Sequence, residues 1–583
     1  MTAPTIDQSL PISQAVPYSP GRLRFLLVVL TLIAFSPVLN AGFTNWDDNR
    51  TLSQNRRLNP PSVQSVAFFW RHPYMDLYAP LTYTLWGALA AATGSNPLHP
   101  FVFHAANLLL HAASSVVVFE ILRRLTHSIP AAGWGAAIFA LHPVQVEAVA
   151  WASGLKDVLC GLLSFLALWQ YILVFDRNDL FPPVNRRRLR YAFATVVFVL
   201  AILAKPTAIM LPLIAMAIDL LSLRREPAAT VRSLGPWVLL AIPFVISTYI
   251  WQPAGSEFVS PEFYLRTLIV LHALAFYLMK LVVPLGLGVD YGWTPHLALQ
   301  KWANIVWIAP AVVATVIWRI RRAVPGVLAG GLVFVAGLLP LLGFVSFDFQ
   351  KFSTVADHYL YIPMLGTGLI VASLVAQWEK SSKDMHRRAD QSVKLLSRIV
   401  LLAIAGLTFR QSLYWRDTQT LFSHAVDVNP NSWVAHNQLA ANALDSGDVA
   451  TATTEAGMAL QLNADYMPAF VTQGAARARG RDMAGAIRSF RQALKLAPDN
   501  AQVMSQLGGA LGQIGRLAQA REMCQRALKF DPDNVQAHLN LGTVLYNLGD
   551  ESGAIKELNI ALSLDPGNQI ATAGLAAIKR NHR

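Results

Sequence analysis

Two adjacent carboxylates, Asp47 and Asp48, follow the first long apolar run of the chain, and such a pair can carry acid–base chemistry. One carboxylate could take a proton from an acceptor hydroxyl while the negative charge of the other raises its pKa. The preceding run, from Leu23 to Phe43, is long enough to cross a bilayer, so we expect the pair at the membrane surface, where a lipid-linked substrate presents its head group. The alternative is an ordinary exposed turn, because Asp-Asp-Asn is common in turns.

Other ionisable side chains recur at the ends of later apolar runs, on the side of the membrane that we predict for Asp47. Ionisable groups near membrane spans are costly to bury and usually face a cavity, so a functional role is the first hypothesis for each. Lysines in this position could neutralise the phosphate of a lipid-linked substrate. The residues are His142, Glu147, Lys156, Asp157, Lys205, Asp357 and His358.

Each of these residues also has a structural interpretation. His142 could be a hydrogen-bonded histidine between helices, and Glu147 could simply pair with Lys156. The lysines could reach lipid head groups on their flexible stems, and Asp357 and His358 could cap the helix that follows them. No residues have the tight spacing of metal ligands and no phosphate-binding glycine loop precedes a helix, so we expect neither a metal centre nor a nucleotide-powered enzyme.

The elements that must position these groups are predicted membrane helices. The chain has 583 residues, 54% of them hydrophobic and 14% charged, with a mean hydropathy of +0.40, which is too apolar for a soluble globular protein. Eleven apolar runs have the length and composition of membrane spans. They lie near residues 23–42, 102–124, 131–152, 157–175, 190–204, 206–221, 236–251, 304–320, 327–344, 359–378 and 394–412.

Many of the basic residues behind the net charge of +13 cluster in short loops between these runs. Such clusters mark loops that face the cytoplasm, and we prefer this interpretation to nucleic-acid binding. With a cytoplasmic N-terminus, eleven crossings place Asp47 and the C-terminal part of the chain outside. A further apolar stretch, 263–287, would leave the clusters Arg319 to Arg322 and Lys380 to Arg398 outside if it crossed. We therefore expect it to dip into the membrane and return, or to lie at the interface.

After about residue 410 the composition changes, and the sequence repeats with a period of 34 residues. Small residues recur at three equivalent positions, where they let paired helices touch, and proline closes three of the units. This pattern predicts tetratricopeptide repeats, which stack into an α-solenoid. The units are 433–466, 467–500, 501–534 and 535–568, with small residues at Ala440, Gly474, Gly508 and Gly542, at Ala452, Ala486, Ala520 and Ala554, and at Ala459, Ala493, Ala527 and Ala561.

Together these patterns predict an all-α protein with three parts. Residues 1–22 are expected to be a flexible tail. Residues 23–412 are expected to form a polytopic membrane domain of about eleven spans with an outer loop at 43–101, and residues 413–583 a tetratricopeptide-repeat domain.

The combination of motifs resembles a known family. The acidic pair is followed by Tyr78-Ala-Pro-Leu-Thr-Tyr83, Phe103 to His111, His142 to Trp151, Gly154-Leu-Lys-Asp157, Ala204-Lys-Pro206 and Asp357-His-Tyr-Leu-Tyr361. With the repeats, these look like the transmembrane and tetratricopeptide repeat-containing proteins and their bacterial relatives, which belong with the GT-C glycosyltransferases and include protein O-mannosyltransferases. The resemblance covers about residues 23–568. Leu155 and His358 each stand where relatives commonly have arginine.

The resemblance implies a glycosyltransferase that moves mannose or another hexose from a polyprenyl-phosphate carrier to a protein hydroxyl on the outer face. Asp47 and Asp48 would be catalytic, one of them deprotonating a Ser or Thr hydroxyl in an inverting transfer. Lys156, Lys205 and His358 would bind the donor phosphate, and the repeats would recruit the acceptor protein. No cofactor is expected; the two aspartates could hold a divalent metal, but nothing indicates one. The supporting groups would be His142, Glu147, Asp157 and Asp357.

Two other classes of protein remain as alternatives. The membrane part could be a non-catalytic anchor, with the repeats acting as a scaffold for envelope assembly, although an anchor needs no polar groups clustered on one face. The chain could also be a transporter of lipid-linked sugars, but a transporter should show related halves or interrupted helices, and the spans show no convincing internal repeat.

Overall fold

The computed structural model describes residues 19–55, 57–75, 77–94, 97–175, 184–251, 262–300, 308–345, 347–381 and 387–581. Residues 1–18, most of the predicted tail, lie outside the described residues. Every regular element in the described ranges is helical, apart from two isolated β-bridges, and the predicted all-α fold is confirmed. The chain forms two compact units. The first comprises Met1–Phe43, Asp47–Leu287 and Thr294–Arg416, and the second comprises Thr44–Trp46, Gly288–Trp293 and Asp417–Arg583.

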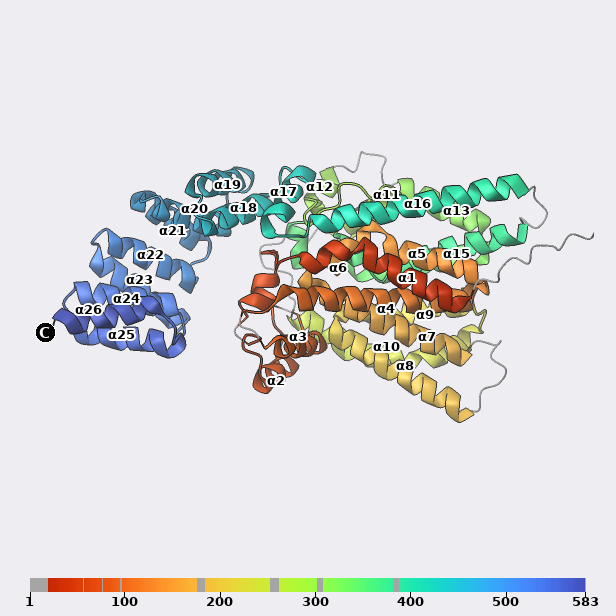
Figure 1. The fold of residues 1–583 in the computed structure, drawn as a ribbon, viewed down its shortest axis with the longest axis horizontal. Helices are drawn as coiled ribbons and strands as arrows, with labels where there is room; N and C mark the ends of the chain where they lie inside the picture. The colour runs from red at the N-terminus through yellow and green to blue at the C-terminus, as the bar shows by residue number, and fades with distance from the viewer. Residues whose placement is uncertain are drawn as a thin grey trace, which may run out of the picture. The chain divides into compact units, whose positions relative to one another are not determined.

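The first unit is a bundle of long helices that run side by side (Figure 1). Among the described residues, five helices are long and apolar enough to cross a membrane, and four shorter apolar helices accompany them, as in an integral membrane protein. The bundle helices are α1 (Pro20–Ala34), α4 (Pro100–Thr126), α5 (Ile129–Leu141), α7 (Leu155–Phe175), α8 (Val184–Ala204), α9 (Leu211–Leu221), α10 (Pro227–Trp251), α13 (Ile308–Ile320), α14 (Pro325–Leu338), α15 (Met364–Ser381) and α16 (Arg387–Leu413). Each predicted span overlaps one of these eleven helices, in chain order, and eight of the eleven are among the apolar helices just counted; the fifth long one is α11 (Phe263–Val282).

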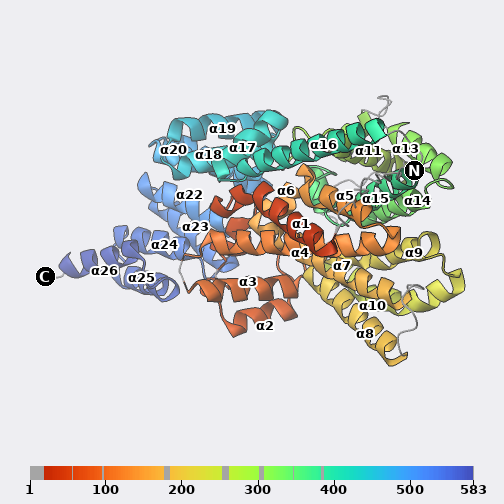
Figure 2. The same cartoon turned by 45° about the vertical axis from the view of Figure 1, so that its right-hand side comes forward.

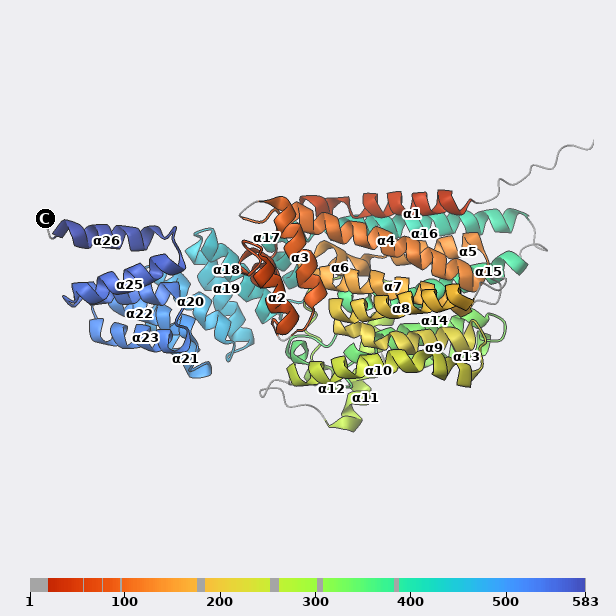
Figure 3. The same cartoon turned by 90° about the horizontal axis from the view of Figure 1, so that it is seen from below.

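Glycines bring three of these helices into close contact. A Cβ atom on Gly135 of α5 would collide with the carbonyl oxygen of Gly368 on α15, and a Cβ atom on Gly366 would collide with the carbonyl oxygen of Gly330 on α14. Small residues allow this approach, which drives helix packing where no water is available to be released. Because α5 and α14 each run antiparallel to α15, both end beside the start of α15 (Figure 3).

Residues 263–282 of the ambiguous stretch form one continuous helix, α11 (Phe263–Val282), which does not turn back on itself, so the predicted dip and return is wrong. Arg266, near its start, donates a hydrogen bond to the carbonyl oxygen of Phe344, just after α14, at 2.8 Å. Near its end, the carbonyl oxygen of Leu281 lies 3.1 Å from Nε2 of His142, just after α5. Both contacts are made at the end of the bundle where α5 and α14 finish. Although α11 is long enough to cross, it lies across that end, which fits the predicted interfacial position.

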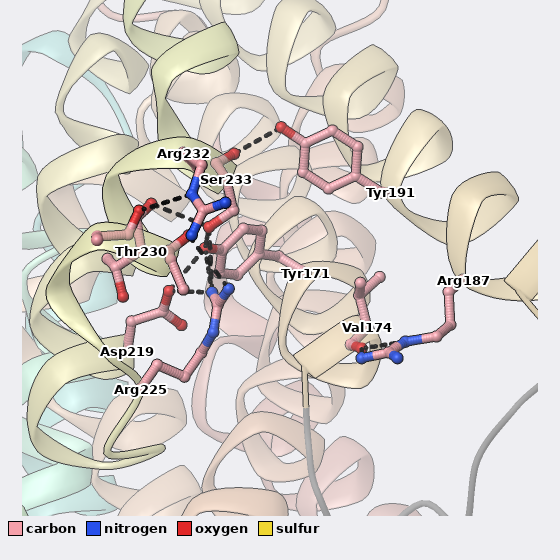
Figure 4. Close-up of polar contacts among 11 residues, drawn as sticks. Tyr171, Val174, Arg187, Tyr191, Asp219, Arg225, Thr230, Arg232 and Ser233 are labelled. Carbon is pink, nitrogen blue, oxygen red and sulfur yellow. Dashed lines mark hydrogen bonds and ion pairs between the residues drawn. The ribbon is translucent and has the colours of Figure 1, made fainter.

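At the other end of the bundle from α11, a buried polar network connects the helices α7, α9 and α10. Asp219 of α9 is fully buried and accepts hydrogen bonds from Arg225 and, at 2.7 Å, from the Tyr171 hydroxyl of α7. The same guanidinium donates to the Ser233 hydroxyl of α10 at 3.1 Å. Figure 4 shows Arg225 pointing toward Asp219, Tyr171 and Ser233. Nearby, Arg187 donates two hydrogen bonds to the carbonyl oxygen of Val174, at 3.2 and 3.1 Å, and so caps the last turn of α7.

The predicted outer loop contains two short helices, α2 (Val63–Arg71) and α3 (Pro80–Thr93), that pack through aromatic side chains. The ring of Phe69 stacks on that of Tyr83, with centroids 4.2 Å apart, and Tyr83 meets Trp86 edge-on at 5.0 Å. These aromatic residues therefore build the core of the loop.

The second unit is a stack of paired helices (Figure 2). Its predicted small positions are where helices touch: a Cβ on Gly474 would come within 2.6 Å of the Phe490 ring, and one on Gly542 within 3.0 Å of Leu558. The helices are α17 (Thr418–Val428), α18 (Trp433–Asp445), α19 (Val449–Leu462), α20 (Met467–Arg479), α21 (Met483–Leu496), α22 (Ala501–Gln513), α23 (Leu517–Phe530), α24 (Val535–Asn547), α25 (Glu551–Leu564) and α26 (Gln569–Asn581).

Candidate active site

Asp48 is fully buried and held by the turn that precedes α7. Its Oδ1 accepts hydrogen bonds from the Ser153 backbone N–H at 2.9 Å and from the Ser153 hydroxyl at 2.6 Å. The Ser153 hydroxyl also lies 2.6 Å from that of Thr51. The turn needs glycine at its last position, because a Cβ on Gly154 would collide with the carbonyl oxygen of Ala148. One oxygen of the Asp48 carboxylate is therefore occupied.

Asp47 is only partly buried, and its backbone is fixed while its carboxylate is not. Its carbonyl oxygen accepts hydrogen bonds from the backbone N–H of Arg50 at 3.0 Å and from the N–H and hydroxyl of Thr51, each at 2.9 Å. Within the described part of the chain, no hydrogen bond is made to the Asp47 carboxylate. Burial raises the pKa of this carboxyl above its ordinary value, and the charge of Asp48 adds to the rise. The positive charge of Lys156 is the strongest influence that lowers it.

Lys156, in the first turn of α7, is the cation whose charge lowers the pKa of Asp47 most. Its ammonium lies 4.5 Å from the centre of the Trp151 ring, and its charge interacts with those of Asp47, Asp48 and Asp157. Among the described residues, the Lys156 ammonium has no hydrogen bond or ion pair. The predicted structural pairing of Glu147 with Lys156 is therefore wrong, and this cation is available for an anionic ligand.

The other two predicted phosphate ligands are already engaged by carboxylates. Lys205, in the turn between α8 and α9, forms an ion pair of 2.5 Å with Asp157 of α7, and both side chains are largely buried. Glu147, in the short helix α6 (Val146–Ala150), accepts a hydrogen bond of 2.9 Å from the backbone N–H of His358. Its second oxygen lies 2.9 Å from Nδ1 of the same histidine.

The remaining predicted residues lie beside this cluster and have other contacts. His142 accepts a hydrogen bond from the backbone N–H of Val144 at 3.4 Å, and its other ring nitrogen faces the Leu281 carbonyl oxygen, so backbone groups engage both nitrogens. This matches the structural interpretation of His142. Asp357 is buried, and its charge interacts with Lys280 of α11.

The structure thus brings most of the predicted residues into one electrostatic cluster drawn from five separate segments. His142 and Asp357 are the two predicted residues at its margin. Sequence reasoning missed Ser153 and Thr51, which fix the acidic pair, although both stand within or next to motifs that it identified. No described group of three or more His, Cys, Asp or Glu side chains is arranged to hold a metal ion. The members of the cluster are Asp47, Asp48, Glu147, Lys156, Asp157, Lys205 and His358.

The arrangement can perform two tasks side by side. Asp47 offers a carboxylate of raised pKa with no hydrogen-bond donor on it in the described residues, as a general base requires. Lys156 offers a positive charge that can stabilise a phosphate as it leaves. Beside these two residues, the charges of Lys205 and Asp157 compensate each other in an ion pair.

Comparison with known proteins finds relatives in the family that the motifs resemble. Two family models described as tetratricopeptide repeat match residues 471–535 and 515–578. The protein O-mannosyl-transferase F38B6.6 of Caenorhabditis elegans is 23% identical over 465 residues, which is 76% of this chain and 63% of the worm protein. The human protein O-mannosyl-transferases TMTC1 and TMTC4 are 24% and 28% identical, over 64% and 30% of this chain and 46% and 26% of their own lengths.

The chain therefore spans less than two thirds of the length of these curated relatives, and the resemblance to them is confirmed. Among solved structures, the tetratricopeptide domain of Arabidopsis OM64 is 25% identical over 20% of this chain and 95% of that chain, with a TM-score of 0.19. The tetratricopeptide-repeat protein TTC0263 of Thermus thermophilus is 20% identical over 31% of this chain and 94% of that chain, with a TM-score of 0.25.

Proposed function

We propose that this protein is a GT-C-type membrane glycosyltransferase that moves a hexose, such as mannose, from a polyprenyl-phosphate carrier to a protein hydroxyl. The observation that carries the proposal is the Asp47 carboxylate of raised pKa, whose charge interacts with that of Lys156, a cation with no hydrogen bond or ion pair among the described residues. The names of the relatives support the reaction class, since they are protein O-mannosyl-transferases.

In the proposed reaction, Asp47 removes the proton of a Ser or Thr hydroxyl as the oxygen attacks the anomeric carbon of the sugar. The bond between that carbon and the phosphate oxygen breaks, and the polyprenyl phosphate leaves with the bonding electron pair. The configuration at the anomeric carbon inverts, because attack and departure occur on opposite faces. The proton remains on Asp47 until solvent takes it.

Asp47 is the better base of the two aspartates. The Asp48 carboxylate is buried, and its Oδ1 already accepts two hydrogen bonds from Ser153, so this oxygen is not available to an acceptor hydroxyl. Its negative charge instead raises the pKa of Asp47. Asp48 therefore tunes the base and fixes the loop that carries it.

Lys156 is the best candidate to bind the donor phosphate, because the other two predicted ligands already contact carboxylates. Lys205 is paired with Asp157, and Nδ1 of His358 lies 2.9 Å from a carboxylate oxygen of Glu147, so both side chains already have a partner. We assign direct contact with the phosphate to Lys156, and to the two pairs the task of holding α7, the α8–α9 turn and the 357–360 segment around it.

The site is proposed to face the outside of a bacterial inner membrane. The outer end of the bundle carries Asp47 and α11, whereas clusters such as Arg186 to Arg190 and Arg319 to Arg322 lie at the opposite ends of the helices, as cytoplasmic loops require. The eleventh helix, α16, runs back to the outer end, where the backbone N–H of Gly42 bonds the carbonyl oxygen of Arg416 at 2.8 Å. The repeats begin at the next residue and would bind the acceptor protein outside.

The reaction class is tested with membranes that contain the wild-type protein, a radiolabelled hexose on either polyprenyl phosphate or a nucleotide, and a pool of envelope proteins. We expect label on protein from the polyprenyl donor alone, released by mild base as expected for a Ser or Thr linkage. Transfer from the nucleotide donor alone would contradict the proposed donor. Absence of transfer from every donor, with proteins still captured by the repeats, would instead favour the scaffold.

A further inference from the structure

The residues just before Asp47 belong to the repeat unit, although they follow α1 in the chain. Thr44, Asn45 and Trp46 group with residues 417–583, and Asp47 begins the next segment of the membrane unit. A single peptide bond thus joins a segment packed within the repeat unit to the proposed catalytic base.

The first repeat helices bind the main chain of Asn45 on both sides. The Asn45 backbone N–H donates a hydrogen bond to the Thr418 hydroxyl at the start of α17, at 3.1 Å. The Asn45 carbonyl oxygen accepts a hydrogen bond from Nε2 of Gln438 on α18, at 2.8 Å. Contacts to both main-chain groups set the position and direction of this residue, whatever its side chain does.

The side chains on either side of Asn45, those of Thr44 and Trp46, are also packed within the repeat unit. The Trp46 ring lies 5.9 Å from that of Phe422 on α17, and Phe422 is fully buried. Thr44 is also buried. Both neighbours of Asn45 are therefore held as well as its backbone.

The helix that carries Gln438 also contacts a second segment of the same unit, Gly288–Trp293. Ser432, the N-cap of α18, donates a hydrogen bond from its hydroxyl to Oδ2 of the buried Asp290 at 2.5 Å, and accepts one from the N–H of Ala435 at 3.1 Å. The other oxygen of Asp290 accepts from the N–H of Gly292 at 2.8 Å. These contacts hold the N-terminus of α18, the helix that carries Gln438.

On the other side of Trp46, the Asp47 carbonyl oxygen is bound by Arg50 and Thr51. We infer that Thr418, Phe422 and Gln438 of the first repeat helices are positioning residues that hold the catalytic loop, so that the repeats set the place of Asp47 in addition to recruiting the acceptor. This inference rests on the proposed function for the role of Asp47. The mechanism is plain: displacement of a catalytic group by about 1 Å can lower the rate a hundredfold.

The test uses full-length protein in lipid nanodiscs and the variant Gln438→Met, which keeps the length of the side chain but has no N–H donor. The matched control is Gln506→Met, since Gln506 occupies the equivalent position two 34-residue units later. Two readouts are taken: hydrogen–deuterium exchange of residues 43–51, and the kcat and acceptor KM of sugar transfer.

We expect Gln438→Met to raise exchange in residues 43–51 and to lower kcat by about tenfold, with the acceptor KM nearly unchanged. Gln506→Met should leave both exchange and kcat at wild-type values. A second pair checks the other hydrogen bond: Thr418→Val should behave like Gln438→Met, and Thr418→Ser, which keeps the hydroxyl, should restore kcat.

Unchanged exchange in Gln438→Met would overturn the inference whatever the activity. So would a raised acceptor KM at constant kcat, because it would mean that Gln438 binds the acceptor instead of holding the loop. Raised exchange without a loss of kcat would also overturn it. If the wild type transfers no sugar from any donor, the proposed function fails, and the exchange of residues 43–51 still decides separately whether the repeats hold this loop.

Discussion

Two neighbouring aspartates differ in their surroundings, and the difference assigns their tasks. Asp48 is buried and bonded by Ser153, whereas the Asp47 carboxylate accepts no hydrogen bond in the described residues and has a raised pKa. The sequence predicts the pair but cannot separate its members, because the separation depends on Ser153, which lies more than a hundred residues away. Only the fold brings that hydroxyl to Asp48.

The pH dependence of transfer should report Asp47. The base works only as a carboxylate, so kcat should rise with pH through its pKa, which burial holds above 3.8. Lys156→Met removes the strongest influence that lowers this pKa. The acidic limb of the kcat profile should therefore move to higher pH in this variant, while the KM for the donor rises by about tenfold or more.

The control for this variant is Lys351→Met, which removes an exposed lysine that pairs with Asp348. It should leave both the pH profile and the donor KM unchanged. An acidic limb that stays in place in Lys156→Met would separate Lys156 from the base and contradict the assignment.

Ser153 should matter through Asp48. Ser153→Ala removes the 2.6 Å hydrogen bond from the hydroxyl and leaves the backbone hydrogen bond in place. We expect a loss of about tenfold in kcat and about 1–2 kcal/mol in the free energy of unfolding, from a buried carboxylate that loses one partner. The measurements are steady-state transfer and thermal unfolding in detergent; wild-type values of both would show that the contact is not used.

At the scale of elements, sequence patterns predicted the helices well where the physics is local. The lengths of the apolar runs predicted the bundle helices in chain order. The period of 34 residues predicted the glycines, such as Gly474 and Gly542, at which repeat helices touch. The position of α11 was harder to predict, because its length and composition are those of a membrane-spanning helix. Its position depends on contacts of Arg266 and Leu281 with segments far along the chain, which no local pattern encodes.

The buried network of Asp219, Arg225, Tyr171 and Ser233 should be important for stability. Asp219→Asn leaves Arg225 without its charged partner, and breaking a buried pair in this way typically costs about 3–5 kcal/mol. The double variant Asp219→Asn with Arg225→Met removes both charges and should recover part of the loss. Thermal unfolding of the three proteins checks this; additive losses would show that the two side chains do not act as a pair.

At the scale of the whole molecule, an odd number of crossings should put the N-terminus and the repeats on opposite sides of the membrane. The native thiols Cys160 and Cys524 are buried, so cysteines introduced elsewhere can report accessibility. We expect Ser552→Cys, at an exposed position in the repeats, to react with a membrane-impermeant maleimide on intact spheroplasts. Arg322→Cys, in the basic loop between α13 and α14, should react only after lysis.

Labelling of Arg322→Cys from outside, with Ser552→Cys protected, would reverse the orientation and place Asp47 in the cytoplasm. The orientation can be predicted from sequence because it depends on the charge of short loops. The joining of residues 44–46 to the repeat unit could not be predicted, because it depends on single hydrogen bonds from Thr418 and Gln438.

The most direct test of the central claim is transfer of a radiolabelled hexose from polyprenyl phosphate by three aspartate variants, each shown to be folded and inserted. Asp47→Asn should lower kcat by about a thousandfold, as expected when a general base is lost. Asp48→Asn keeps an oxygen for Ser153 and loses only its charge, so it should lower kcat by about tenfold. The exposed Asp348→Asn should behave as wild type. Full activity in Asp47→Asn, or equal losses in Asp47→Asn and Asp348→Asn, would contradict the account.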